Sequence, residues 1–185
     1  MALFTASELR ARASSKVLAK SANRILVEAA KSFGTARAYD IFLSHSYADA
    51  AVILGLKTKL EDFGFSVYVD WLEDSELDRS SVSPATAAIL RERMRACRSF
   101  LYASSPNAIS SKWMPWELGF FDGHNGKVAI VPIVDTPRAS FVGQEYLGLY
   151  PYVDEDKATD GRLYLWINRG KPGDSRQFGT WLAAA

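Results

Sequence analysis

Cysteine, histidine and long apolar runs are scarce in this sequence, and each scarcity excludes a class of protein. The single cysteine, Cys97, cannot form a disulfide within the chain, so no cystine framework stabilises the fold. Only His45 and His124 accompany it, which makes a four-ligand zinc site implausible, and we expect no metal. The longest apolar runs, such as 128–134, are too short to span a bilayer, and no signal-peptide hydrophobic region follows Met1. We therefore expect a cytoplasmic protein with no membrane partner.

The chain also lacks an excess of charge of either sign. Lys and Arg total 22 and Asp and Glu total 21, which gives a net charge of +1. Binding to nucleic-acid phosphates needs a concentrated basic surface, so we expect no nucleic-acid partner. With 185 residues, of which 48% are hydrophobic, the chain can bury the core of one globular domain.

The first 37 residues form a basic segment ahead of the rest of the chain. They hold seven Lys or Arg and two Glu, a local charge of +5. Thr5 followed by Glu8 fits a helix capping box, and apolar residues recur at helical spacing as far as Phe33. We predict an amphipathic helical extension over 1–37 and a main domain over 38–185. The apolar face is mostly alanine, which favours packing on the main domain or a dimer partner over membrane contact or a transit-peptide role.

From residue 38 onward, short apolar runs alternate with segments of helical periodicity. The apolar runs are nearly continuous, as in strands that are buried on both faces. Strands that alternate with helices pair in parallel through right-handed crossovers. The sequence therefore predicts an α/β fold with three layers around a central parallel sheet. We expect strands at 39–44, 66–70, 99–103 and 127–134, weaker ones at 152–153 and 162–167, and helices at 48–63, 84–97, 105–121 and 174–182.

The loop after the first of these strands lies where such folds bind ligands, beyond the carboxyl ends of the strands. It reads Ser44-His45-Ser46-Tyr47. Because it has no glycine, it is neither a dinucleotide fingerprint nor a phosphate-binding P-loop. It does bring hydroxyls and an imidazole to a helix N-terminus, where anions bind. N-capping of the helix by Ser46 is an equally simple explanation.

The segment after the second strand, 70–78, holds five acidic side chains and no basic one. Carboxylates bind metal ions, but the spacing lacks the glycine and the alternation of a calcium loop. A solvated loop that is extended by self-repulsion explains the acids more simply. Trp71 and Leu72 are the exceptions, because apolar residues in a charged loop indicate docking onto a ligand or onto a second copy of the chain.

The most distinctive group of residues lies in the aromatic-rich helix expected after residue 110. Trp113, Glu117 and Phe121 share one face of that helix at four-residue steps. A carboxylate between aromatic rings suits a flat cationic ligand. An ordinary amphipathic helix, with the tryptophans in the core and Glu117 outside, is the alternative that periodicity alone favours.

Taken together, these segments resemble a TIR domain (Toll/interleukin-1 receptor type) of the compact bacterial kind. The family's first box is similar to residues 39–46 (YDIFLSHS), and its BB loop falls at 70–83. Its Ser-x-Trp-x-x-x-Glu-Leu box is similar to residues 111–118 (SKWMPWEL). The similarity covers 38–134 well and the C-terminal third loosely. It implies a flavodoxin-like parallel sheet of about five strands.

The resemblance also implies a function. Many bacterial TIR domains cleave NAD⁺ at the nicotinamide–ribose bond, some cyclise the ADP-ribose, and in bacteria such products are signals in anti-phage defence. The family's catalytic glutamate maps onto Glu117, and its ring-stacking tryptophan maps onto Trp113. NAD⁺ is then the substrate and no separate cofactor is needed. The loop of Ser44, His45, Ser46 and Tyr47 is expected to hold the phosphates of the substrate.

Two further expectations come with the family. Several members carry a second aromatic residue in the loop after the fourth strand, but 135–141 has no tryptophan. Phe141 or Tyr146 is the candidate to replace it, so the type of product stays open. The family also implies self-association into dimers or filaments, for which Trp71 and Leu72 are the candidate contacts, and a downstream effector that reads the product.

Three other functions fit parts of the sequence. A non-catalytic TIR module that acts by homotypic self-association is the main alternative, but the pairing of Trp113 with Glu117 favours the enzyme. A phosphorelay receiver shares the topology but needs acidic residues at two strand ends, where this chain has Ser44 and Ala103. A nucleoside transferase of related fold also uses a glutamate, and assays with nucleosides and with NAD⁺ separate the two.

Overall fold

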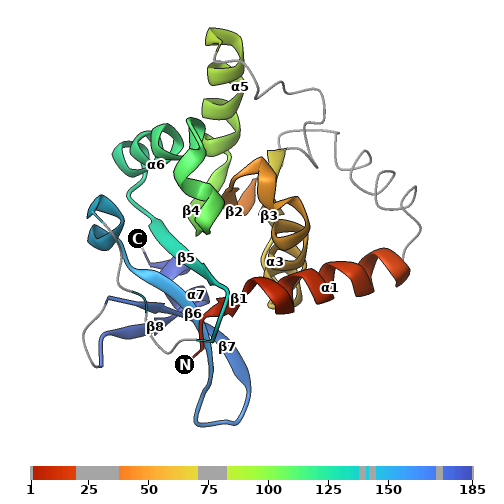
Figure 1. The fold of residues 1–185 in the computed structure, drawn as a ribbon. Helices are drawn as coiled ribbons and strands as arrows, with labels where there is room; N and C mark the ends of the chain where they lie inside the picture. The colour runs from red at the N-terminus through yellow and green to blue at the C-terminus, as the bar shows by residue number, and fades with distance from the viewer. Residues whose placement is uncertain are drawn as a thin grey trace.

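A mostly parallel sheet forms the centre of the molecule (Figure 1). The computed structural model describes residues 2–19, 38–70, 83–137, 141, 145–169 and 173–184. Five parallel strands follow one another in the order β3-β2-β4-β5-β6. Counted along the chain, this is the order 2-1-3-4-5 of flavodoxin-like folds, so the predicted fold class is confirmed. The strands are β2 (Tyr39–Ser44), β3 (Val67–Tyr68), β4 (Cys97–Ser104), β5 (Val128–Val134) and β6 (Tyr152–Lys157).

Helices cover both faces of this sheet and complete the three layers (Figure 1). Alternate residues of β2 point to opposite faces, so Ile41 and Leu43 join one hydrophobic cluster and Phe42 joins the other. The first cluster is covered by α1 (Ala6–Ala19), α3 (Ala50–Asp62) and α7 (Phe178–Ala183), and the second by α5 (Pro84–Arg95) and α6 (Trp113–His124). In the ranges described, no helix combines the length and the apolar character that crossing a membrane requires.

The N-terminal segment is built into the sheet through a strand that the sequence did not reveal. β1 (Phe4–Thr5) pairs in parallel with β5, where Phe4 lies opposite Ile133. The hydroxyl of Thr5 accepts a hydrogen bond from the backbone N–H of Glu8 at 3.3 Å. The predicted start of the helix is therefore confirmed. Residues 20–37, which the helix prediction also covered, lie outside the described residues, as do Trp71 and Leu72.

Helix α1 packs directly on α3. The backbones approach so closely that a Cβ atom at Gly55 would lie 1.9 Å from the carbonyl oxygen of Leu9. Lys59, a buried residue of α3, adds two ion pairs: its Nζ lies 2.5 Å from Oε1 of Glu8 and 2.8 Å from Oε1 of Glu155 on β6. Packing of the N-terminal helix on the main domain is thus confirmed.

The C-terminal part departs from a purely parallel plan. β7 (Leu163–Asn168) and β8 (Ser175–Gln177) extend the sheet beyond β6 as antiparallel strands. The helix expected over 174–182 is therefore wrong at its start, because 175–177 pair with β7 before α7 begins.

The single helix expected over 105–121 is also divided. The 3₁₀-helix η2 (Pro106–Ser110) comes first, and α6 begins at Trp113. Ser111 between them is extended, with φ −76° and ψ 126°, so the chain turns before α6 starts. Two further 3₁₀-helices, η1 (Tyr47–Asp49) and η3 (Glu145–Leu149), lie in the loops before α3 and β6.

Candidate active site

A hydrogen bond between β2 and α6 forms the centre of the candidate site. The hydroxyl of Ser44, the last residue of β2, donates to Oε2 of Glu117 at 2.6 Å. Both side chains are 0% exposed. The alternation along β2 turns Ser44 toward the face that α6 covers, and Glu117 lies one turn into α6 to meet it. The alternative that left Glu117 on the outside of its helix is therefore wrong.

Trp113 opens α6 and lies on the same side of the helix as Glu117, one turn earlier. Its side chain is 7% exposed, and its ring meets that of Trp116 edge-on, with the centroids 5.4 Å apart. The two tryptophans therefore differ in exposure: Trp113 is buried and Trp116 is half-buried. The prediction that Trp113 and Glu117 share one face of a helix is confirmed, and the structure adds that this face is buried, while their contact with a substrate stays a prediction.

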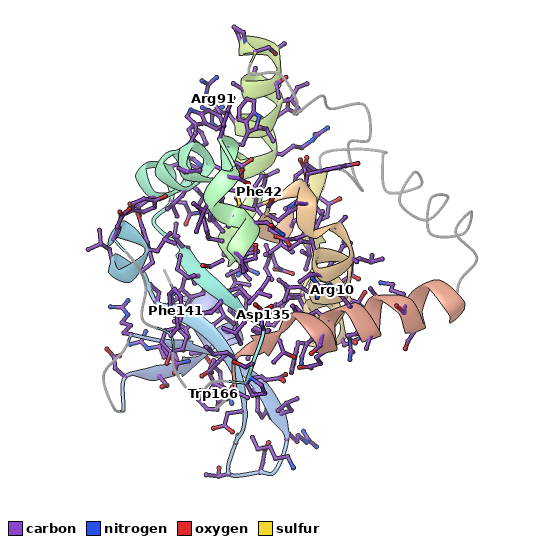
Figure 2. All side chains as sticks on the ribbon, viewed as in Figure 1. Arg10, Phe42, Arg91, Asp135, Phe141 and Trp166 are labelled. Atoms are coloured by element: carbon purple, nitrogen blue, oxygen red, sulfur yellow. The ribbon has the colours of Figure 1, made fainter. Side chains whose placement is uncertain are left out.

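The outer aromatic stripe of α6 is covered by arginines of α5. The guanidinium of Arg91 lies 5.3 Å from the ring centroid of Trp116, and that of Arg95 lies 5.5 Å from Phe120. Figure 2 shows Arg91 where α5 and α6 meet. Trp116 and Phe120 are partly buried against the second cluster, and these cation–π contacts cover rings that remain at the surface.

His45 is turned into the protein. Its Nδ1 lies 2.9 Å from the carbonyl oxygen of Leu43, and its Nε2 lies 3.4 Å from Oδ1 of Asp70. A carbonyl oxygen only accepts, so Nδ1 carries a proton and donates. The ring is buried and links the end of β2 to Asp70, two residues after β3. Contact between His45 and phosphate stays a prediction.

The next two residues of the loop, Ser46 and Tyr47, differ in exposure. Ser46 is buried at the N-cap position of η1, but its side chain makes no capping hydrogen bond. Tyr47 is 80% exposed, so its ring is free to meet a ligand from solvent. The N-capping explanation for Ser46 is therefore wrong for its side chain, and the ligand contacts predicted for both residues remain predictions.

Tyr102 is a residue of the site that the sequence reasoning missed. It lies on β4 directly beside Ser44 in the parallel register, so both side chains point to the same face. Burial raises the pKa of Tyr102 to about 12, and the hydroxyl of Tyr146 and the charge of Glu117 add to this rise. A tyrosine in an apolar strand gives no sequence signal of its own; only the register beside Ser44 identifies it.

Tyr146 and Phe141, the two candidates for a second aromatic residue, lie in different surroundings. Tyr146, on η3, lies close enough to Tyr102 to raise its pKa, and so joins the group around Glu117. Phe141 packs edge-on against Tyr152 of β6, with the ring centroids 5.9 Å apart (Figure 2). The structure therefore connects Tyr146 to Glu117 through Tyr102, whereas the contact of Phe141 is with β6.

Asp49 is a second residue that the sequence reasoning did not assign. Its carboxylate is 5% exposed and accepts hydrogen bonds from Ser105 at 2.5 Å and from Asn107 at 2.7 Å. The signal that could have found it is an aspartate at the end of a strand-to-helix loop. Within the described ranges, no group of three His, Cys, Asp or Glu could hold a metal ion.

The geometry at the carboxyl ends of β2 and β4 is that of a flavodoxin-like fold with an acid at the topological switch point. The TIR domain model matches residues 41–163, which is more than half of the chain. The chain therefore belongs to the TIR domain family.

Three known proteins show how this chain compares with others. It is 50% identical to the "Probable 3′ cyclic ADP-D-ribose synthase ThsB′" of Bacillus cereus (strain MSX-D12) over 165 residues, which is 88% of this chain and 85% of that protein. It is 33% identical over 85 residues, 45% of this chain and 22% of the other, to TIR2 of Cytobacillus dafuensis, which is also named for cyclic ADP-D-ribose synthesis. The TIR domain of the Toll-related receptor TRR-2 from Hydra magnipapillata is 20% identical, with a TM-score of 0.40 over 56% of this chain and 75% of that one.

Proposed function

We propose that this chain cleaves NAD⁺ at the bond between nicotinamide and ribose and closes the remaining ADP-ribose into a cyclic product. The observation that carries the proposal is the buried Glu117, hydrogen-bonded to Ser44 and one turn after Trp113. The relative that is half identical over most of both chains, and is named as a probable 3′ cyclic ADP-D-ribose synthase, supports the same reaction.

The chemistry needs little more than one oriented carboxylate. Nicotinamide leaves as a neutral molecule from a cationic ring, so no general acid has to protonate it. The ribose carbon then carries oxocarbenium-like positive charge, as in glycoside hydrolysis. Glu117 stabilises that charge, and the hydrogen bond from Ser44 fixes the direction in which the carboxylate faces. Trp113 stacks on the nicotinamide ring, and the loop of Ser46 and Tyr47 holds the diphosphate near the N-terminus of α3.

Access to the acid requires a change in the side chains around it. Glu117 and Ser44 have no exposed surface, and Trp113 has very little. A substrate that touches Glu117 must therefore displace some of its neighbours, and Trp113 and Tyr146 are the residues that we expect to move. The enzyme thus has a closed resting form and an open reacting form.

The cyclic product forms when a hydroxyl of the same ADP-ribose, in place of water, attacks the ribose carbon. We place Tyr146 beside the adenine-linked half of the substrate, because it lies near Tyr102 at the edge of the group around Glu117. The ring of Tyr146 at that position keeps the flexible intermediate folded, so that its own hydroxyl reaches the ribose carbon. Without this ring, attack by water is favoured over cyclisation, and linear ADP-ribose becomes the main product.

The biological setting follows the same proposal. We infer a cytoplasmic enzyme of bacterial anti-phage defence, whose product is read by a downstream effector. It uses NAD⁺ as substrate without a metal or separate cofactor. Self-association into dimers or filaments through Trp71 and Leu72 is part of the proposal, supported by the apolar character of these two residues within an acidic segment.

Replacement of the acid tests the reaction. Glu117→Gln keeps the shape of the side chain and its hydrogen bond with Ser44 but removes the charge, so we expect nicotinamide release to fall by about 10³-fold. Release from NAD⁺ is followed by chromatography, and mass spectrometry separates the cyclic product from ADP-ribose, which contains one more water. Asp122→Asn, an exposed acid on the same helix, is the matched control and should leave release unchanged.

The alternative function is an outcome of the same experiment. A folded Glu117→Gln protein that releases nicotinamide at the rate of the unmodified chain would exclude the enzymatic proposal. A non-catalytic module that acts by self-association would then be the better account. Parallel incubation with a nucleoside in place of NAD⁺ separates the proposed reaction from that of a nucleoside transferase.

A further inference from the structure

Asp49 stands where a helix cap is expected but does not cap its helix. It is the residue before α3, and its side chain makes no capping hydrogen bond there. Instead Oδ2 accepts from the hydroxyl of Ser105 at 2.5 Å, and Oδ1 accepts from Nδ2 of Asn107 at 2.7 Å. Both oxygens of this buried carboxylate are therefore used to hold the loop that follows β4.

That loop leads by further hydrogen bonds into the first turn of α6. The hydroxyl of Ser105 also accepts from the backbone N–H of Ala108 at 3.2 Å. The backbone N–H of Ser111 donates to the carbonyl oxygen of Ala108 at 3.1 Å. The hydroxyl of Ser111 accepts in turn from the N–H of Met114 at 3.3 Å. An unbroken path thus joins Asp49 to the turn that carries Trp113.

Two separate ties therefore fix α6 relative to β2. One is the hydrogen bond from Ser44 to Glu117, inside the site. The other is the group of Asp49, Ser105 and Asn107, at the entrance to the helix. Packing on the second cluster holds α6 against the sheet, and two separate ties fix its orientation more closely than one tie does. Displacements of about 1 Å in an active site cost up to about 10²-fold in rate.

We propose that Asp49 is a positioning residue for the reaction: its carboxylate holds η2 and the first turn of α6 in place, so that Trp113 and Glu117 keep the arrangement that bond cleavage needs. This inference rests on the proposed function. Asp49 acts through Ser105 and Asn107 and touches no reacting atom.

An exchange of the carboxylate and the amide tests this role. Asn107→Asp sets two carboxylates against each other where a hydrogen bond of 2.7 Å now lies, and their repulsion opens the loop. Adding Asp49→Asn restores one carboxylate and one amide with their places exchanged, and the amide oxygen at position 49 still accepts from Ser105. Asp49→Asn alone keeps that acceptor and is the milder single change.

We expect Asn107→Asp to lower kcat for nicotinamide release about tenfold, with KM changed by less than about threefold, because orientation at the reacting bond is lost. The double variant should return to within about threefold of the unmodified kcat. Tyr150→Phe is the matched control, since it removes a hydrogen bond of 2.9 Å to Asp122 at the far end of α6. It should leave kcat unchanged.

Amide hydrogen exchange over residues 113–117 gives a reading that does not need turnover. Exchange should be faster in Asn107→Asp and return to normal in the double variant. A folded Asn107→Asp protein with normal kcat and normal exchange would overturn the inference, as would a folded double variant without recovery. If the unmodified chain releases no nicotinamide even when the site around Glu117 is opened, the proposed function fails, and the exchange pattern alone then decides whether Asp49 positions α6.

Discussion

Three polar side chains of the site have almost no water around them. Ser44, Glu117 and Tyr102 are between 0% and 3% exposed. Polar groups in such surroundings are stable only with partners inside the protein, because desolvation without a hydrogen bond costs about 1–3 kcal/mol. The hydroxyl of Ser44 donates to Glu117, and Tyr146 lies close enough to Tyr102 to raise its pKa. Burial among these groups favours the neutral form of Tyr102, so its hydroxyl keeps its proton.

The retained proton of Tyr102 makes the stability of the fold depend on alkaline pH. The pKa of Tyr102 is raised from 10.0 to about 12 in the folded protein. Between these values the unfolded chain loses this proton and the folded chain keeps it, so the free energy of unfolding falls as pH rises. We expect Tyr102→Phe to remove about 2 kcal/mol of that fall by pH 11.5.

Urea unfolding from pH 9 to pH 11.5 measures this dependence in the two proteins. The variant has its own stability at pH 9, and the comparison concerns only the change above that value. Parallel curves for Tyr102→Phe and the unmodified chain would show that Tyr102 ionises normally in the fold.

At the scale of elements, the contact of α1 with α3 depends on the absence of one side chain. Gly55→Ala should lower the free energy of unfolding by at least about 2 kcal/mol, because the new Cβ would lie 1.9 Å from the carbonyl oxygen of Leu9. Helix propensity alone predicts a gain of about 1 kcal/mol for the same change. The sign therefore separates packing from propensity, and urea unfolding measures it.

Gly123→Ala provides the matched control for that measurement. Gly123 lies in α6 with nothing within 4 Å of an added Cβ, so alanine there should stabilise the protein by about 0.5–1 kcal/mol. A Gly55→Ala protein that gains stability as Gly123→Ala does would mean that α1 does not pack on α3 as described.

The elements that the sequence predicted well are those with strong periodicity. Residues 39–44 were expected as a strand and form β2, and the run 127–134 became β5 with one residue less. Strands β1 and β8 were missed because two or three residues are too few to show alternation, and Ser175–Gln177 is polar throughout. Their pairing is decided by distant partners on β5 and β7, which no local pattern records.

The candidate site could be predicted in part. The resemblance to the TIR family identified Glu117 and Trp113, and the strand ending at Ser44 placed it at the correct edge of the sheet. Periodicity could not orient Glu117, because Trp116 and Phe120 give α6 a second apolar side, which arginines of α5 cover. Tyr102 and Asp49 belong to the site through strand register and loop contacts, which appear only in three dimensions.

At the scale of the whole molecule, one thiol reports on the integrity of the fold. Cys97 begins β4, near the middle of the sheet, and donates a hydrogen bond to the carbonyl oxygen of Arg93 at 3.2 Å. Burial raises the pKa of this thiol, and reagents attack the thiolate.

We therefore expect a thiol reagent to label the folded protein about 10³-fold or more slowly than the urea-unfolded chain, in step with the population that opens globally. The rate is read from absorbance, and each chain gives one equivalent because it holds one cysteine. Rapid labelling in the absence of urea would contradict the burial of β4.

The complete burial of Glu117 has a consequence for the cell that makes this protein. An enzyme that cleaves NAD⁺ with an exposed catalytic acid would deplete the NAD⁺ of the cell for as long as the enzyme was present. With the proposed activity, the enclosed acid lets a cell stockpile the enzyme harmlessly. Synthesis of the protein and its activation are then separate events. The activating stimulus has only to move the few aromatic side chains that cover Glu117.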